Sequence, residues 1–491
     1  MLDKLVPSQF HMDKTAVIDM ERSFTFLDLS ERIAAIQHCL PKEQGSKVAI
    51  YLPNNFDHVA AFWSLVISGM IIIPINIQMT EHEIITLLEQ ADVCAVITTN
   101  QNYNFFNKLS LDIVYVEDII MDGIGGHPMV HPRDSDAPMV FLCTSGTTGN
   151  AKIVQLSQCN IETSVLGFID KMNYDGETED IKIVLATLLT TSYGIMMLSV
   201  FMIRGVTIVL LPGKFTLETL YKIVEAHRVT HYEGGNLVPQ LMNQLKDRPN
   251  PYNISSLKYI CFGGSKMTAD EMKSLTSAYP QIKFCLGYGM SEAAAMISKQ
   301  QLPGPLKKIE SSGTAIKGVE IAVEVDGRIM KEPYVKGEFV IKGANVMLGY
   351  YNNKVETDKV LQNGYLYTGD IGYLDEEGYV YISGRIKNII NIRGFNVHPE
   401  EIEECLLGSK LVKDCVVYGE IDAHAQEIVC ANVMPSDINV TLEEIKEYCA
   451  SHLAEYKWPK KIQFCDSIMR NVAGKKERIG NTGNKNDFWR V

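Results

Sequence analysis

The sequence predicts an α/β protein with a large N-terminal domain of parallel α/β subdomains plus a β-rich subdomain, followed by a small α+β C-terminal domain. In the first half, nearly continuous apolar strands alternate with longer amphipathic stretches, which is typical of parallel sheets covered on both faces. From about Gly313, short strand patterns are separated by Gly-rich turns, which indicates a mainly antiparallel β region. After Arg385 the remaining residues mix helix and strand patterns.

Short apolar runs and amphipathic periodicity predict the individual elements. The strands expected in the first half are 48–52, 71–75, 93–98, 139–143, 183–187, 206–211, 257–262 and 282–286. The helices expected there are 56–68, 81–90, 217–227 and 269–278. The β region is expected to contain strands at 321–325, 337–341 and 379–382. The last domain is expected to contain helices at 400–407 and 442–452 and strands at 415–420 and 428–433. We place the domain boundary near 386–388, giving domains 1–386 and 387–491.

One apolar run, 59–77, approaches the length of a membrane span but contains serines, a glycine, a proline and an asparagine. We interpret it as a buried helix that stops at Gly69, followed by a strand. No integral membrane segment is expected, and the N-terminus lacks the basic and apolar stretches of a secretory signal.

The composition excludes some partners. The chain has 491 residues, with 46 Lys and Arg against 59 Asp and Glu, so its net charge of −13 disfavours nucleic acid and anionic lipid. The 11 cysteines have no C-x-x-C spacing, which indicates reduced thiols and a cytoplasmic protein. The segment 457–491 is nevertheless basic, so a local site for a small anion remains open.

The strongest local motif is TSGTTGNAK at 144–152, directly after the apolar strand 139–143. Glycines let backbone N–H groups surround a phosphate, hydroxyl groups add donors, and Lys152 adds a positive charge. Taken alone, the segment fits an ordinary Ser/Thr/Gly turn equally well.

Six further segments occur with this motif in a characteristic order. They are FGGSKM at 262–267, GYGMSE at 287–292, GEFVIKGANVMLGYYN at 337–352, YTGD at 367–370, GRIKNIINIRGFNVHPEEIE at 384–403, and YKWPKKIQF at 456–464 leading into RNVAGKKER at 470–478. In this order the chain resembles, over essentially its whole length, the superfamily of adenylate-forming enzymes, which contains acyl-CoA synthetases, adenylation domains and luciferases.

The resemblance implies a site for ATP and Mg²⁺. Glu292 is expected to hold Mg²⁺ and to act in catalysis, Tyr288 to stack on adenine, Asp370 to accept hydrogen bonds from the ribose hydroxyls, and Arg385 to bind ribose or phosphate oxygens. The other residues expected to bind ATP or AMP are Thr144, Ser145, Gly146, Thr147, Thr148, Gly149, Lys152, Gly264, Ser265, Gly289 and Ser291.

The resemblance also implies two half-reactions and a mobile C-terminal domain. Lys475 is expected to bridge the carboxylate and the α-phosphate while acyl-AMP forms and pyrophosphate leaves. Asn388 stands at the hinge position, where the family usually has Asp or Lys, and Gly394 lies in the loop expected to line the thiol channel. The thiol acceptor is expected to be CoA or, alternatively, the phosphopantetheine of a carrier protein.

The acid substrate is less defined. Thr191 stands where many acyl- and aryl-CoA ligases have His and amino-acid adenylation domains have Asp, which disfavours an ordinary amino acid. The other pocket candidates are Tyr193 and the small residues Gly263, Gly287 and Ala293, which are consistent with an apolar or aromatic acid.

The sequence also bears on two other functions. A nucleotide-binding regulator without catalysis is suggested by departures such as Ala151 and Val472, which replace family prolines, but Lys475 and Glu292 are retained. A serine hydrolase is disfavoured because no G-x-S-x-G motif occurs.

Overall fold

The computed structural model describes residues 11–120, 128–144, 152–172, 181–211, 216–263, 267, 269–302, 306–385, 390–397, 399–422 and 426–468. The chain forms two compact units. The first comprises Met1–Ile77, Gln90–Leu142 and Ile153–Gly384, and the second comprises Gln78–Glu89, Cys143–Lys152 and Arg385–Val491. The expected boundary between residues 386 and 387 lies outside the described residues and stays a prediction.

A seven-stranded sheet has the order β19-β8-β7-β4-β3-β5-β6. The pairs among β3, β4, β5, β6 and β7 are parallel, whereas β19 pairs with β8 in the antiparallel direction. Its strands are β3 (Lys47–Ile50), β4 (Ile71–Pro74), β5 (Ala95–Thr98), β6 (Asp112–Tyr115), β7 (Pro138–Thr144), β8 (Lys152–Ser157) and β19 (Gly349–Tyr350).

A nine-stranded sheet has the order β15-β14-β13-β12-β11-β9-β10-β1-β2. Its centre is parallel, and antiparallel strands lie at both edges. Its strands are β1 (Thr15–Asp19), β2 (Arg22–Thr25), β9 (Lys182–Ala186), β10 (Thr207–Leu210), β11 (His231–Gly235), β12 (Tyr259–Gly263), β13 (Lys283–Tyr288), β14 (Ser298–Lys299) and β15 (Thr314–Ala315).

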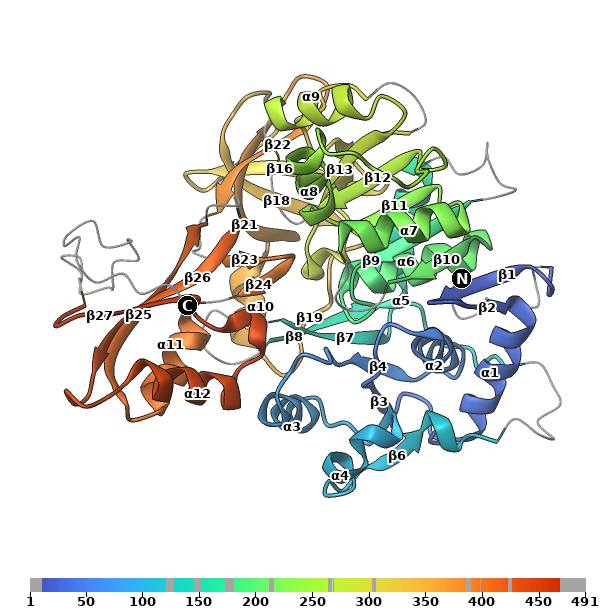
Figure 1. The fold of residues 1–491 in the computed structure, drawn as a ribbon, viewed down its shortest axis with the longest axis horizontal. Helices are drawn as coiled ribbons and strands as arrows, with labels where there is room; N and C mark the ends of the chain where they lie inside the picture. Colours follow the sequence, from blue (N-terminus) through green and yellow to red (C-terminus); the bar gives the residue numbers. More distant parts are fainter. Residues whose placement is uncertain are drawn as a thin grey trace. The chain divides into compact units, whose positions relative to one another are not determined.

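Helices cover both faces of the nine-stranded sheet (Figure 1). On one face, α7, α8 and α9 share a core with alternate strand residues such as Ile260 and Phe284. On the other face, α1, α2, α5 and α6 share a core with both sheets. The helices are α1 (Phe26–His38), α2 (Phe56–Ile67), α3 (Glu81–Gln90), α4 (Tyr103–Phe106), α5 (Gln158–Met172), α6 (Ser192–Arg204), α7 (Leu217–His227), α8 (Leu237–Leu245), α9 (Ala269–Ala278), α10 (Lys354–Val360), α11 (Pro399–Gly408) and α12 (Leu442–His452).

Helix α2 contains most of the long apolar run. Asn55 caps its N-terminus by accepting a hydrogen bond from the backbone N–H of His58, and every helix residue except Asp57 is buried. The helix ends before Gly69, which has a φ of +72° that favours glycine. The buried-helix interpretation is therefore confirmed, and among the described residues no helix is long and apolar enough to cross a membrane.

A six-stranded sheet follows with the order β17-β16-β18-β21-β20, and β22 pairs with β21. The pairings given for β16, β17, β18, β20 and β21 are antiparallel, which confirms the predicted β region. The strands are β16 (Val319–Val325), β17 (Arg328–Met330), β18 (Gly337–Gly343), β20 (Leu361–Gln362), β21 (Tyr365–Leu374) and β22 (Val380–Arg385).

The second unit contains the remaining strands. The order β25-β26-β27 forms one sheet, and β23 pairs with β24. Helices α11 and α12 share a separate core with these strands. The strands are β23 (Ile390–Ile392), β24 (Phe395–Val397), β25 (Val412–Ile421), β26 (Glu427–Pro435) and β27 (Lys461–Phe464). The α/β prediction with a large first domain and a small α+β region after it is confirmed.

Candidate active site

The GYGMSE segment makes a tight turn at the carboxyl end of β13. Ala294 and Ala295 have φ values of 47° and 82°, so the chain reverses sharply after Glu292. A Cβ atom on Gly289 would lie 1.6 Å from the carbonyl oxygen of Ala295. The glycine is therefore required for close packing inside the turn.

Tyr288 and Asp370 are brought together across 82 residues of sequence. The Tyr288 hydroxyl donates a hydrogen bond to Oδ2 of Asp370 at 2.7 Å, and both side chains are buried. Asp370 lies on β21 after Gly369, whose φ is +73° and whose N–H donates to the Glu338 carboxylate at 2.8 Å. The expected adenine and ribose contacts are thus neighbours in the structure.

Glu292 is held by a residue that the sequence analysis did not single out. The Tyr350 hydroxyl donates to Oε1 of Glu292 at 2.9 Å. Burial, and then the neighbouring Glu292 carboxylate, raise the pKa of Tyr350, so it remains a hydrogen-bond donor. Because Tyr350 pairs with Val154 on β8, Glu292 is tied to the strand that follows the TSGTTGNAK segment.

Asn345, also absent from the predictions, supports the same turn from the GEFVIKGANVMLGYYN segment. Its buried Nδ2 donates to the carbonyl oxygens of Ala293 at 3.2 Å and Met296 at 2.9 Å. Ala293 itself is fully buried in the core formed with the six-stranded sheet. The pocket candidate Ala293 therefore packs inside the protein in this structure.

The described residues fit the way in which proteins hold Mg²⁺ with a nucleotide. Among them, no group of three or more His, Cys, Asp and Glu residues could hold a metal ion. Mg²⁺ is commonly bound through one or two carboxylates and the substrate phosphates. A single carboxylate, Glu292, is consistent with that mode.

The first turn of α6 adjoins the GYGMSE turn. Ser192 and Ser291 have their hydroxyl oxygens 3.3 Å apart. Thr191 caps the helix by accepting from the N–H of Gly194 at 3.0 Å and donates to the Leu188 carbonyl oxygen at 2.8 Å. The Thr191 hydroxyl thus has a structural role.

The other pocket candidates lie close to this turn. The Tyr193 hydroxyl donates to the buried carboxyl group of Glu233 at 2.5 Å. A Cβ atom on Gly263 would lie 3.1 Å from the Gly287 carbonyl oxygen, so these glycines are adjacent. Glu233 was missed by the sequence analysis, because its strand β11 has the sequence HYEGG, which lacks the apolar run that predicts a strand.

The remaining predicted residues are placed only in part. Thr144 donates to the carbonyl oxygen of Lys152 at 3.3 Å, at the base of the expected phosphate loop. Gly394, with a φ of +91°, lies in the turn between β23 and β24. Arg385 ends β22, and its side chain is not described. Ser145, Gly146, Thr147, Thr148, Gly149, Gly264, Ser265, Asn388 and Lys475 lie outside the described residues.

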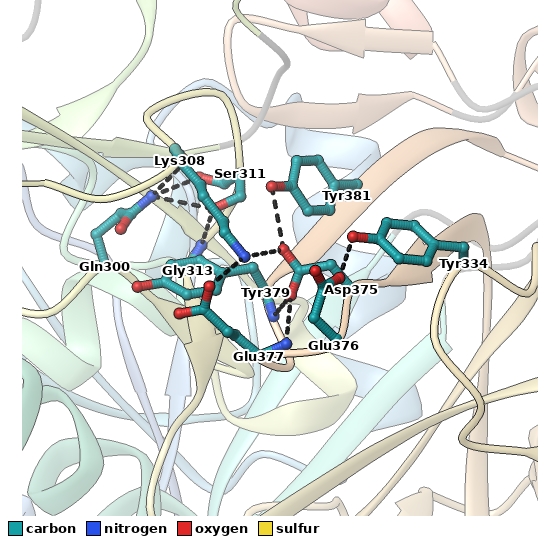
Figure 2. A network of polar contacts seen from close by, with 10 residues as sticks. All are labelled: Gln300, Lys308, Ser311, Gly313, Tyr334, Asp375, Glu376, Glu377, Tyr379 and Tyr381. Atoms are coloured by element: carbon teal, nitrogen blue, oxygen red, sulfur yellow. Dashed lines mark hydrogen bonds and ion pairs between the residues drawn. The ribbon is translucent and has the colours of Figure 1, made fainter.

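A polar network fixes the turn between β21, which carries Asp370, and β22 (Figure 2). The side chain of Asp375 is only 3% exposed. Its Oδ2 accepts from Lys308 Nζ at 2.6 Å and Tyr381 at 3.3 Å, and its Oδ1 accepts from two backbone N–H groups of the turn. Desolvation opposes ionisation, but these hydrogen bonds hold the pKa of Asp375 below its ordinary value.

We expect Gly289→Ala to disrupt the turn after β13, because the added methyl group would overlap the Ala295 carbonyl oxygen. The free energy of unfolding should fall by at least about 3 kcal/mol, measured by urea denaturation. Gly287→Ala is the matched control, since its nearest neighbour would be 3.5 Å away. Equal stability losses in the two variants would contradict this account of the turn.

We expect Asp375→Asn to lower the free energy of unfolding by about 1–3 kcal/mol at pH 7. Folding lowers the pKa of Asp375. The ionised carboxylate therefore contributes fully to the free energy of unfolding above about pH 4, and this contribution is lost as the pH falls through the pKa of the folded state. Urea denaturation at several pH values should therefore show the difference from the wild type shrinking in acid.

The control for this network is Glu377→Gln. Glu377 is the second carboxylate bound to Lys308, at 2.9 Å, but its side chain is 51% exposed. An exposed ion pair contributes little, so this variant should stay within about 1 kcal/mol of the wild type. A Glu377→Gln loss as large as that of Asp375→Asn would refute the central role of Asp375.

Comparison with known proteins relates this site to a family. The AMP-binding enzyme family matches residues 6–351, and the AMP-binding enzyme C-terminal domain matches residues 401–475. A 2-succinylbenzoate–CoA ligase from Bacillus cereus is 29% identical over 469 residues, which are 94% of both chains.

Solved structures agree with this relationship. An o-succinylbenzoate CoA synthetase double mutant from Bacillus subtilis, bound to its product analogue, has a TM-score of 0.84 at 26% identity over 96% of both chains. The same enzyme with ATP and magnesium has a TM-score of 0.68 at 26% identity, covering 96% of this chain and 97% of that chain. The predicted resemblance to adenylate-forming enzymes and the predicted AMP-forming acid–thiol ligase class are confirmed. The chain belongs to the AMP-binding enzyme family.

Proposed function

We propose that the chain converts a carboxylic acid, ATP and CoA into an acyl-CoA thioester, AMP and pyrophosphate. The observation that carries the proposal is the turn after β13, which brings Tyr288, Ser291 and Glu292 to one strand end beside Asp370. Ligands of open α/β sheets bind at the carboxyl ends of strands. The curated relatives are named as CoA ligases, which favours CoA over a carrier protein as the acceptor.

The described residues would bind the nucleotide in a fixed orientation. Tyr288 presents a ring for adenine while its hydroxyl is engaged with Asp370, whose carboxylate would accept from the ribose hydroxyls. Glu292, oriented by Tyr350, would hold Mg²⁺. When bound, that ion would neutralise charge on the phosphates.

The first half-reaction needs two anions to meet. A carboxylate oxygen attacks the α-phosphorus, the bond to the leaving pyrophosphate breaks, and acyl-AMP results. We assign Lys475 to bridge the carboxylate and α-phosphate, Arg385 to ribose or phosphate oxygens, and the 144–149 segment with Lys152 to the phosphates.

In the second half-reaction, the CoA sulfur attacks the acyl carbon and AMP leaves. No cysteine of the chain is needed as a nucleophile, because a mixed anhydride already has a good leaving group. We assign Asn388 to the hinge between the two steps and Gly394 to the thiol channel. A cytoplasmic location is part of the proposal, because all eleven cysteines are free thiols.

Acid-dependent ATP–pyrophosphate exchange over a panel of carboxylic acids tests the proposal. At least one acid should support exchange and, with CoA added, yield a thioester detectable by mass spectrometry. Exchange with no acid would refute the enzyme assignment. Thioester formation with a holo-carrier protein but not with CoA would refute the choice of acceptor.

We expect Lys475→Ala to reduce the exchange rate at least about 100-fold, because its charge is assigned to the first transition state. Conversion of supplied acyl-AMP and CoA into thioester should remain within about 3-fold of the wild type, because that step does not involve pyrophosphate departure. Lys476→Ala, its neighbour, is the control and should change neither rate appreciably. Equal losses in both half-reactions for Lys475→Ala would contradict its assignment.

A further inference from the structure

A row of polar side chains crosses three neighbouring parallel strands of the nine-stranded sheet. Glu233 on β11 is in register with Cys261 on β12, which is in register with Cys285 on β13. Registered residues on parallel strands point to the same face. All three side chains are fully buried, so they form a closed layer beneath that face.

Two residues closer to the carboxyl ends, the same face carries three glycines, Gly235, Gly263 and Gly287. Each is only half-buried, and a Cβ atom on Gly235 would meet nothing within 4 Å. Two strand residues span about 7 Å. The three glycines therefore form a strip that has no side chains of its own, one step above the buried row. The strip is open at Gly235, whereas a Cβ atom on Gly263 would lie 3.1 Å from the Gly287 carbonyl oxygen and one on Gly287 would lie 3.6 Å from the Met296 sulfur.

The strip faces helix α6. Tyr193, in the first turn of α6, is half-exposed and donates to Oε2 of Glu233 at 2.5 Å. The neighbouring Ser192 contacts Ser291 of the GYGMSE turn at 3.3 Å. A ligand lying on the glycines with its carboxylate toward this turn would thus extend toward Tyr193 and Glu233.

Glu233 has unused hydrogen-bonding capacity. Its Oε1 has no nitrogen or oxygen donor among the described residues, and the thiol of Cys261 is its other hydrogen-bonding neighbour. Desolvation raises the pKa of Glu233, although the Lys299 charge and the Tyr193 hydroxyl oppose the shift. A buried carboxyl oxygen of this kind is stabilised by a donor.

Lys299, whose charge acts on Glu233, is engaged inside the protein. Lys299 is 1% exposed, lies 4.9 Å from the ring centroid of Phe168, and hydrogen-bonds with Cys261. Desolvation disfavours its charge, but the two thiols and Glu233 keep the pKa of Lys299 above its ordinary value. Lys299 thus balances the charge of Glu233, and its ammonium group is already engaged by the Phe168 ring and Cys261.

We infer that Glu233 and Tyr193 form the far end of the acid-binding site and select a monocarboxylic acid whose distal end carries a neutral hydrogen-bond donor, such as a hydroxyl group. The inference rests on the proposed function. A hydroxyl group can donate to Glu233 or to the Tyr193 oxygen, whereas a second carboxylate has no proton to donate to either oxygen. The named relatives act on 2-succinylbenzoate, an acid with two carboxyl groups, so the inferred substrate differs in class from theirs.

Three acids that differ only in the distal group test this inference: phenylpropionic acid, its para-hydroxy derivative and its para-carboxy derivative, with the matching benzoic acids as a shorter series. ATP–pyrophosphate exchange gives kcat/KM for each. In one of the two series, kcat/KM for the para-hydroxy acid should exceed that for the unsubstituted acid at least about 10-fold, and kcat/KM for the para-carboxy acid should be the lowest.

Glu233→Gln and Tyr193→Phe should each reduce the preference for the hydroxyl group at least about 10-fold, and Glu233→Gln should also improve use of the para-carboxy acid. The readout is the ratio between acids, which a general loss of folding or activity would not change. Glu31→Gln, an exposed residue of α1, is the matched control and should leave the ratios unchanged.

The outcomes separate the two proposals. Exchange with none of the acids in this set or in the wider panel would overturn the proposed function and this inference together. Exchange without dependence on the distal group, or with unchanged ratios in both variants, would overturn the inference alone. A wild-type preference for the para-carboxy acid would also overturn it.

Discussion

The close packing of Gly289 against the Ala295 carbonyl oxygen is the constraint on which the site depends. Only a residue without a side chain allows the chain to reverse within a few residues of β13. Because of this reversal, Tyr288, Ser291 and Glu292 emerge at one strand end rather than along an extended segment. A wider turn would separate the residues assigned to the nucleotide base from those assigned to its phosphates.

Each of these three side chains is fixed by a different part of the first unit. Tyr288 bonds to Asp370 on the six-stranded sheet, Glu292 to Tyr350 at the edge of the seven-stranded sheet, and Ser291 contacts helix α6. A side chain held by a distant partner loses less conformational entropy when a ligand arrives. The turn therefore connects two sheets and a helix, and its conformation depends on the contacts with all three.

The sequence predicts much of the fold and part of the site. A nearly continuous apolar run locates α2, and short apolar runs locate the strands around it, because these residues are buried together with their neighbours in the sequence. The partners of the turn are different. Tyr350 lies 58 residues from Glu292, and Asn345 lies 52 residues from Ala293, so no local spacing relates them. Their motif segment was recognisable, but which of its side chains support the turn was not.

Glu233 shows why a buried charge is informative about function. A carboxyl group without exposure costs folding free energy unless its oxygens are satisfied, and the described contacts satisfy one oxygen better than the other. An apolar residue would complete the core of the sheet at less cost. Glu233 lies two residues before Gly235 on the same strand face, and Tyr193 contacts its carboxyl group. Binding the distal end of the acid would explain the buried carboxyl group, whereas packing of the core does not. The same strand that stabilises the sheet can therefore limit which acids the enzyme activates.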